Sequence, residues 1–269
     1  MPFAPAGLIT LTTDFGATEP FAGIMHGRIL ARFGTARIVD LSHGIPPGRA
    51  DLAGFWLGHA WLDFPPGTLH VAVVDPGVGT TRGVLLALAA GRLLLAPDNG
   101  LLPEALRRHP EVRWLGMDPR LPARLGLAAL SRTFHGRDLF APVAAALAAG
   151  ALLPEDFGTP VEPADPAPLP VPRRDADGVL GRVLVADHFG NLITNIDAEL
   201  LAACRQPVIE AGRREWPLLP TYGSAGNGAA LALINAFGLV ELALNGGDAA
   251  AALGIGAGAP VRVRDGITA

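Results

Sequence analysis

The sequence LHVAVVDPGVGTTR occupies residues 69–82 and joins an apolar run to a polar loop. The run is rich in valine and nearly continuous in its hydrophobicity, which favours a strand that is buried on both faces. Asp75, Pro76 and the glycines that follow end this strand in a tight turn, and Arg82 closes the loop. A buried strand that ends in a polar, glycine-bearing loop is typical of a parallel sheet in an α/β domain.

Three further apolar runs in the first half of the chain predict strands, each followed by a polar or glycine-bearing loop. They are residues 8–13, 37–41 and 92–96. Residues 20–33 and 49–62 have apolar positions at helical spacing and lie between these strands, and residues 138–149 predict a further buried helix. This strand–helix–strand repetition predicts an α/β N-terminal domain with a mainly parallel sheet.

The composition changes in the second half. Residues 154–172 contain seven prolines in 19 positions, which excludes a long helix or a central strand and predicts an inter-domain connector. Short apolar runs separated by glycine-rich turns follow, at residues 178–186, 207–210, 228–235, 240–244 and 260–264. They predict a smaller all-β, barrel-like C-terminal domain. We therefore expect an α/β domain at 1–160, a proline-rich connector at 161–177 and a β-barrel domain at 178–269.

Composition also limits the classes of function. The 269-residue chain is 50% hydrophobic and 17% charged with a net charge of −4, which fits a large core and disfavours a nucleic-acid partner. All 21 basic residues are arginines, which excludes a lysine Schiff base and a P-loop lysine. Prolines and glycines interrupt the longest charge-free stretch, residues 216–240, so no membrane span is predicted. A single cysteine, Cys204, and no apparent secretory signal predict a cytoplasmic protein.

Polar clusters follow several predicted strands, at the position where ligands bind in open α/β sheets. Asp14, within the motif TTDFG, either accepts the hydroxyls of a ribose or forms an Asx-type turn or a helix cap. Asp75 and Arg82 are expected to pair, and the pair serves either catalysis or structure alone. His135, within TFHGRD, is either an acid, a base or a residue that positions water, or it is part of a helix-cap region.

Other polar groups are less informative by themselves. PDNG at residues 97–100 is interpreted as a plain turn. The seven histidines show no H-E-x-x-H or other metal-ligand spacing, so no metal site is predicted. In the second half, DHFGN at 187–191, the single tyrosine Tyr222 and the amides of Asn235 and Asn245 have roles that spacing alone leaves open.

In chain order, seven motifs together resemble one family. They are TTDFG, HGIPP, VVDPGVGTTR, PDNG, TFHGRD, DHFGN and NAFGLVELALNGGDAA. This set is similar to the S-adenosylmethionine (SAM) hydroxide adenosyltransferases, the SAM hydrolases related to the SAM-dependent fluorinase and chlorinase. The resemblance extends from about Ile9 to Arg264. It implies that water attacks the ribose C5′ of SAM to give adenosine and L-methionine. We expect no cofactor, because SAM is the substrate.

The resemblance also implies an assembly and individual roles. It implies a homotrimer whose substrate sites lie between one subunit's N-terminal domain and a neighbour's C-terminal domain. Asp75, Arg82 and His135 match the catalytic set, and Asp14 matches the ribose-binding aspartate. The other implied substrate contacts are Asp187, Phe189, Asn191, Tyr222, Asn235, Phe237, Leu244 and Gly246.

Two alternatives to a SAM hydrolase stay open, namely a SAM-dependent halogenase and a non-catalytic module that binds SAM or adenosine. The halogenase branch has Tyr and Thr where this chain has Asp75 and Val78, and Tyr-Ser where it has His135-Gly136. Without that serine a halide ion lacks its partner. We therefore expect the hydrolase.

Overall fold

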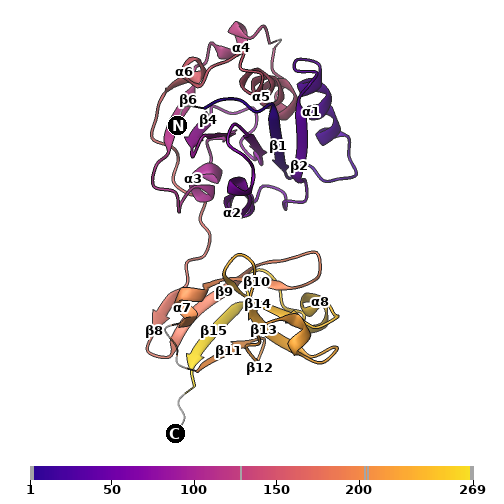
Figure 1. The fold of residues 1–269 in the computed structure, drawn as a ribbon, viewed down its shortest axis with the longest axis vertical. Helices are drawn as coiled ribbons and strands as arrows, with labels where there is room; N and C mark the ends of the chain where they lie inside the picture. The colour runs from indigo at the N-terminus through magenta and orange to yellow at the C-terminus, as the bar shows by residue number, and fades with distance from the viewer. Residues whose placement is uncertain (1–2, 128, 203, 205, 267–269) are drawn as a thin grey trace. The chain divides into compact units, whose positions relative to one another are not determined.

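The computed structural model describes residues 3–127, 129–202, 204 and 206–266. The chain forms two compact units, Met1–Pro168 and Leu169–Ala269, so the division falls inside the proline-rich segment (Figure 1). Parts of that segment are ordered. Proline at the first helical position allows a one-turn helix, α6 (Pro154–Phe157), and Arg173–Asp175 forms a short strand, β8, within the expected connector.

A mixed sheet forms the centre of the N-terminal unit, with seven strands in the described part of the chain in the order β2-β1-β3-β5-β4-β6-β7. Their bounds are β1 (Leu8–Thr13), β2 (Arg37–Ser42), β3 (Leu69–Val73), β4 (Val84–Ala89), β5 (Arg92–Pro97), β6 (Arg113–Met117) and β7 (Gly158–Pro160). The four strands predicted from the sequence, β1, β2, β3 and β5, pair in parallel, which confirms the α/β class. β4, β6 and β7 extend the sheet in antiparallel pairing and were not predicted.

Both faces of this sheet are covered. Val71 and Val73 of β3 belong to one apolar cluster, which includes residues of α1 and α5, whereas Ala72 and Val74 belong to a second cluster with α2 and α3. The alternation follows from the two-residue period of a strand. The helices are α1 (Phe21–Leu30), α2 (Ala50–Ala60), η1 (Trp61–Asp63), α3 (Leu101–Ala105), α4 (Leu121–Arg124), η2 (Gly136–Phe140) and α5 (Ala141–Ala148). Among the described residues, no helix has the length and apolar character that crossing a membrane requires.

The C-terminal unit is an antiparallel sheet that almost closes on itself, as predicted. Its main path is β12-β11-β15-β9-β10-β14-β13, with β8 paired to β9. Its strands beyond β8 are β9 (Gly178–Ala186), β10 (Leu192–Asp197), β11 (Pro207–Ala211), β12 (Arg214–Trp216), β13 (Ala230–Ile234), β14 (Leu239–Leu244) and β15 (Pro260–Asp265). The short helices are α7 (Ala198–Ala202), η3 (Tyr222–Ser224) and α8 (Ala249–Leu253). The chain just after β12 bonds to β13, through Leu219 N to Ala232 O at 2.8 Å, and so nearly closes the barrel.

Helices α2 and α3 approach closely because two glycines one turn apart face α3. A Cβ atom at Gly54 would lie 2.7 Å from Leu101 O, and one at Gly58 would lie 2.8 Å from Ala105 O. The loop before α2 carries Gly48, and the loop before α3 carries Asn99. This contact therefore holds together two loops at the edge of the sheet.

We expect Gly54→Ala to destabilise the N-terminal unit by about 1–3 kcal/mol, because the added methyl group forces the helices apart. The control is Gly23→Ala on α1, where a Cβ atom would meet nothing within 4 Å. That substitution should be neutral, or stabilise by up to about 1 kcal/mol through helix propensity. Thermal unfolding followed by circular dichroism compares the two. Equal melting temperatures would contradict the packing described here.

Candidate active site

Two predicted site carboxylates lie at the same edge of the N-terminal sheet. Asp14 directly follows β1, and Asp75 follows β3 after one residue, while β1 and β3 pair in parallel with Thr13 opposite Val73. A pocket of about 150 Å³ opens at this edge. Its lining consists of Asp14, Phe15, Gly48, Val73, Asp75, Pro76, Val78, Thr133, Phe134, His135 and Gly136. The structure thus brings Asp14, Asp75 and His135 to one cavity.

Arg82 holds the Asp75 carboxylate with a two-pronged contact. Arg82 Nε donates to both carboxylate oxygens, at 2.9 and 3.0 Å, and Arg82 Nη2 donates to Oδ2. The side chains are only 11% and 6% exposed, respectively, and the guanidinium lies 5.5 Å from the centroid of the Phe140 ring. A charge-assisted, bidentate pair of this kind fixes the orientation of the carboxylate. The predicted pairing is therefore present.

The same guanidinium determines the protonation of His135. Arg82 Nη2 lies 2.9 Å from His135 Nδ1. Because arginine only donates, Nδ1 must accept, and the imidazole is neutral with its hydrogen on Nε2. Burial, followed by the charge of Arg82, lowers the pKa of His135 below its usual 6.5, although Asp75 acts in the opposite direction. The ring hydrogen of His135 is therefore on Nε2, and a hydrogen bond of the ring to the Ser131 backbone also raises the pKa.

Backbone packing places Arg82 and His135 within reach of each other. Gly79 has φ +76°, and a Cβ atom there would lie 2.3 Å from Arg132 O, so only glycine lets these two loops touch. The second loop is anchored twice, by Phe134 N on Ser131 Oγ and by Ser131 N on Asp138 Oδ2, both at 3.0 Å. Asp138 thus holds the loop that carries His135.

Asn99 has a positioning role that the sequence interpretation missed. Its Nδ2 donates to Val74 O at 2.9 Å, which anchors the backbone immediately before Asp75. The segment PDNG is a turn, as predicted, but it is also a support for the site. The sequence contained a signal for this role. β5 ends at Pro97 and pairs in parallel with β3, so Asn99 lies at the same edge of the sheet as Asp75.

A glycine-bearing loop holds the Asp14 carboxylate. Gly48 N donates to Asp14 Oδ2 at 2.9 Å, and Gly48 has φ +72°. The loop itself is bound to the chain after β1, since Gly16 N donates to His43 O at 2.9 Å. Asp14 therefore presents a fixed carboxylate at the rim of the pocket.

The remaining predicted contacts lie in the C-terminal unit. Asp187 and Asn191 close the loop between β9 and β10, since Asp187 Oδ1 accepts from Asn191 N at 2.9 Å and Asn191 Nδ2 donates to Asp187 Oδ2 at 3.1 Å. Gly190, with φ +81°, is required here, because a Cβ atom would lie 2.1 Å from an oxygen of Asp248. Phe189 stands at the tip of this loop and is 73% exposed.

Tyr222 and Asn235 meet at a carboxylate that the sequence interpretation missed, Glu241. Tyr222 donates its hydroxyl hydrogen to Glu241 Oε1, and Asn235 Nδ2 donates to Oε2 at 3.1 Å. Glu241 is only 3% exposed. Burial, together with the hydrogen bond to Glu241, raises the pKa of the Tyr222 hydroxyl above its ordinary value. A lone carboxylate within the apolar run LVELAL was the available signal.

The other three C-terminal residues lie at the ends of two strands. Phe237 N donates to Asn235 Oδ1 at 3.0 Å in the turn between β13 and β14. Leu244 ends β14, and Gly246 follows with φ +70°. The structure thus gathers Asp14, Asp75, Arg82 and His135 in one unit and places the other eight predicted residues in the second unit.

Comparisons with known proteins point to one family over nearly the whole chain. Family models described as the SAM hydroxide adenosyltransferase N-terminal and C-terminal domains match residues 9–158 and 181–262. The chain is 39% identical over 274 residues to a Salinispora tropica protein named (R)-S-adenosyl-L-methionine hydrolase, covering 98% of this chain and 100% of that protein. It is 40% identical to a Thermus thermophilus protein of the same name, covering 93% and 97%. A fluorinase from Nocardia brasiliensis is 29% identical, covering 96% and 97%.

Two solved structures share the fold of this chain. An uncharacterized conserved protein from Thermotoga maritima has a TM-score of 0.84 at 30% identity, covering 95% of this chain and 99% of that one. A conserved hypothetical protein from Thermus thermophilus has a TM-score of 0.73 at 36% identity, covering 95% and 98%. The chain therefore belongs to the SAM hydroxide adenosyltransferase family.

Proposed function

We propose that the protein hydrolyses SAM to adenosine and L-methionine. The observation that carries the proposal is the partly buried Asp75–Arg82–His135 cluster beside the pocket that Asp14 lines. Relatives that are 36–40% identical and are named (R)-S-adenosyl-L-methionine hydrolase support it. In those names L gives the configuration at the α-carbon of the methionine part. We therefore infer that (R) gives the configuration at the sulfonium sulfur, and that this chain accepts the same sulfonium epimer.

The reaction needs an activated nucleophile. It needs no general acid, because the departing thioether is neutral and takes no proton. The oxygen of water attacks the ribose C5′, the C5′–S bond breaks, and its electron pair returns to sulfur. The leaving group is neutral methionine. The water oxygen loses one proton, so the site has to accept a proton and stabilise a hydroxide-like oxygen as charge develops.

We assign these tasks to different residues. Arg82 stays protonated, so it supplies positive charge and is not the base. His135 Nδ1 already accepts a hydrogen bond from Arg82 and Nε2 carries hydrogen, so His135 donates to the nucleophile and positions it. Asp75 is then the proton acceptor, because its Oδ1 accepts one hydrogen bond from Arg82 and retains a second lone pair.

The apolar part of the pocket favours the reaction. Hydroxide-like oxygen and sulfonium carry opposite charges, and these are neutralised as the C5′–O bond forms. Val73, Val78 and Phe134 line the pocket beside the charged groups and limit hydration of the separated charges. We propose that Asp14 binds the ribose hydroxyls. For the predicted residues of the C-terminal unit, we propose contacts to the adenine and methionine parts of SAM.

The first test is product analysis. Purified protein incubated in ¹⁸O-labelled water with SAM that contains both sulfonium epimers should give adenosine labelled at its 5′-oxygen, plus methionine. The (R) epimer should be consumed first. Parallel reactions with chloride and fluoride test the halogenase alternative. Formation of only 5′-halogenated adenosine, or intact SAM with well-folded protein, would falsify the assignment.

The second test separates a donor role of His135 from a base role. We expect His135→Ala and Asp75→Asn to lower kcat by about 10²–10⁴-fold. His135→Gln should retain clearly more activity than His135→Ala, because the glutamine amide still donates near the position of Nε2. Equal losses in the two His135 variants would contradict the donor role.

The pH profile provides an independent check of the same residue. Because the pKa of His135 is lowered and the neutral form is the active one, activity should be present at and above the usual 6.5 and be lost as the pH falls through the lowered pKa. The part of the acid limb that protonation of His135 causes should disappear in His135→Gln. An acid limb centred above 6.5 in the wild type would contradict the assignment.

We further propose that the protein is a cytoplasmic homotrimer whose active sites combine the N-terminal unit of one subunit with the C-terminal unit of the next. The distribution of the residues supports this, because the catalytic set lies in the first unit and the exposed Phe189 and Tyr222 lie in the second. A site built from the N-terminal unit of one subunit and the C-terminal unit of the next is a head-to-tail interface, and such interfaces form rings when the rotation between subunits closes. The unpaired thiol of Cys204 suits a reducing compartment.

Subunit mixing tests the shared site. Asp75→Ala and Asp187→Ala should each be inactive alone. Trimers assembled from an equal mixture should regain about a quarter of the wild-type activity, because each site draws its two halves at random. The control is a mixture of Asp75→Ala with Arg82→Ala, which lie in the same unit and should stay inactive together. Absence of rescue in well-formed mixed trimers, or a fully active monomer, would contradict the shared site.

A further inference from the structure

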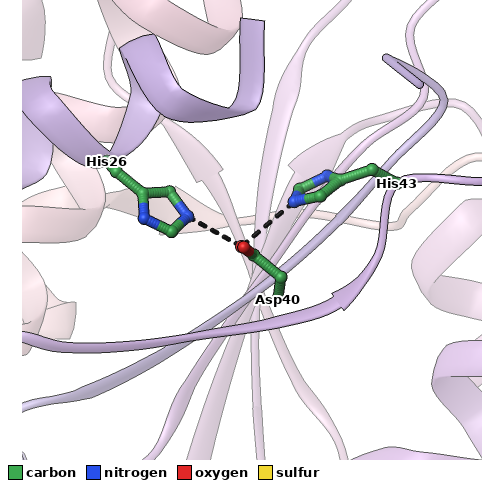
Figure 2. A group of neighbouring side chains, drawn as sticks. All are labelled: His26, Asp40 and His43. Atoms are coloured by element: carbon green, nitrogen blue, oxygen red, sulfur yellow. Dashed lines mark hydrogen bonds and ion pairs between the residues drawn. The ribbon is translucent and has the colours of Figure 1, made fainter. Parts of the chain in front are cut away.

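Two histidines and one aspartate converge outside the catalytic pocket. His26 Nε2 lies 2.7 Å from Asp40 Oδ1, and His43 Nε2 lies 3.0 Å from the same oxygen (Figure 2). The three candidate ligand atoms all lie within 4.8 Å of one another. They come from three places in the fold, namely α1, β2 and the loop that follows β2. None of the three residues lines the pocket described above.

A register shift in β2 brings Asp40 and His43 to the same side. Residues three apart in a regular strand point to opposite faces. Here Leu11 pairs with Asp40 but Thr12 pairs with Ser42, so Leu41 is an extra residue in β2. One inserted residue changes the alternation by one position, and bulges of this kind commonly re-aim a side chain at a functional site.

His43 has a buried ring nitrogen with an unmet bonding capacity. Its side chain is only 10% exposed, and its Nδ1 lies 2.8 Å from Thr13 Oγ1. Thr13 is itself fixed, since Phe15 N donates to its hydroxyl oxygen at 3.2 Å. His43 Nε2 is buried, and although it is close to Asp40 it makes no hydrogen bond of acceptable geometry with any described residue. The contact of Nδ1 with Thr13 thus orients the ring so that Nε2 faces Asp40. In metal sites, the second ring nitrogen of a ligating histidine is commonly held by a hydrogen bond in the same way.

We propose that His26, Asp40 and His43 bind one divalent transition-metal ion of the zinc, cobalt or nickel class. Two imidazoles with one carboxylate suit these ions, whereas magnesium and calcium prefer oxygen ligands alone. Bond lengths of about 2.0–2.2 Å place tetrahedral ligands about 3.3 Å apart, so the two nitrogen–oxygen separations of 2.7 and 3.0 Å need only a small opening. His26 and Asp40 are 30% and 44% exposed, which gives the ion an entry path and room for a water ligand.

The ion would stabilise the fold near the active site and take no part in the chemistry. It would connect α1, β2 and the loop after β2, which also carries Gly48, the donor to Asp14. Binding requires a neutral His43 with hydrogen on Nδ1, which then donates to Thr13 Oγ1. The search for spacing motifs missed the cluster, because the bulge and the fold, rather than one regular element, bring the three residues together.

The test uses tag-free, full-length protein freed of metal with a chelator. Calorimetric titration with Zn²⁺ should show that one ion binds per chain. Thermal unfolding should show a higher melting temperature when Zn²⁺ is present. His26→Gln and Asp40→Asn should each weaken the affinity by about tenfold or more, as loss of a direct ligand requires. The matched control is His188→Gln, which removes an exposed histidine of the C-terminal unit and should leave the affinity unchanged.

Two results would overturn the proposal. One is absence of binding at about 100 µM free Zn²⁺, a range in which a built site is occupied. The other is an unchanged affinity in both His26→Gln and Asp40→Asn. Because His43 is largely buried, its role is tested without a variant, by X-ray absorption at the zinc edge of the loaded wild-type protein. Two imidazoles with oxygen ligands support the site, and a sulfur ligand from Cys204 contradicts it.

Discussion

Parallel pairing of β1 with β2 and β3 is the constraint on which the polar features of the N-terminal unit depend. It brings the carboxyl ends of three strands to one edge, with Thr13 opposite Val73 and Thr12 opposite Ser42. Asp14, His43 and Asp75 then follow within two residues of those ends. β1 and β3 are buried along their whole length, so their register resists change. A slip by one residue would turn every side chain to the opposite face.

Arg82 converts this common edge into a site with defined protonation. A buried ion pair is weak evidence for stability, because the desolvation free energy of the two charges offsets much of their Coulomb attraction. Its contribution here is geometric. One planar guanidinium donates to Asp75 and to His135 at the same time, which a lysine ammonium would do with less directional control. Because the cation only donates, it also fixes the imidazole tautomer.

The sequence predicts the parts that depend on local pattern and misses those that depend on contacts between loops. The strands β1, β3 and β5 are nearly continuous apolar runs, and β2 carries apolar residues at Ile38, Val39 and Leu41. The missed strand β4 is equally apolar, but its hairpin to β5 turns through Ala90 and Gly91, which lack the Asn-Gly or Asp-Gly signature of such turns. The four N-terminal site residues were identified from motifs and their order. The approach of His135 to Arg82 rests on the packing of Gly79 against Arg132, which no spacing reveals. Glu241 was missed for a related reason, since only the fold brings Tyr222 and Asn235 to it.

The neutral state of His135 also determines how the pocket treats a charged substrate. Asp14 and Asp75 are carboxylates, Arg82 is a cation, and the imidazole adds no charge, so this group carries one net negative charge. A sulfonium ion is therefore attracted to the pocket, whereas a protonated His135 would cancel the excess and leave no net attraction. After C5′–S cleavage the sulfur is a neutral thioether, and that attraction is lost. In the proposed mechanism, the burial and the nearby guanidinium that lower the pKa of His135 serve binding of the cation and release of the product as well as the chemical step.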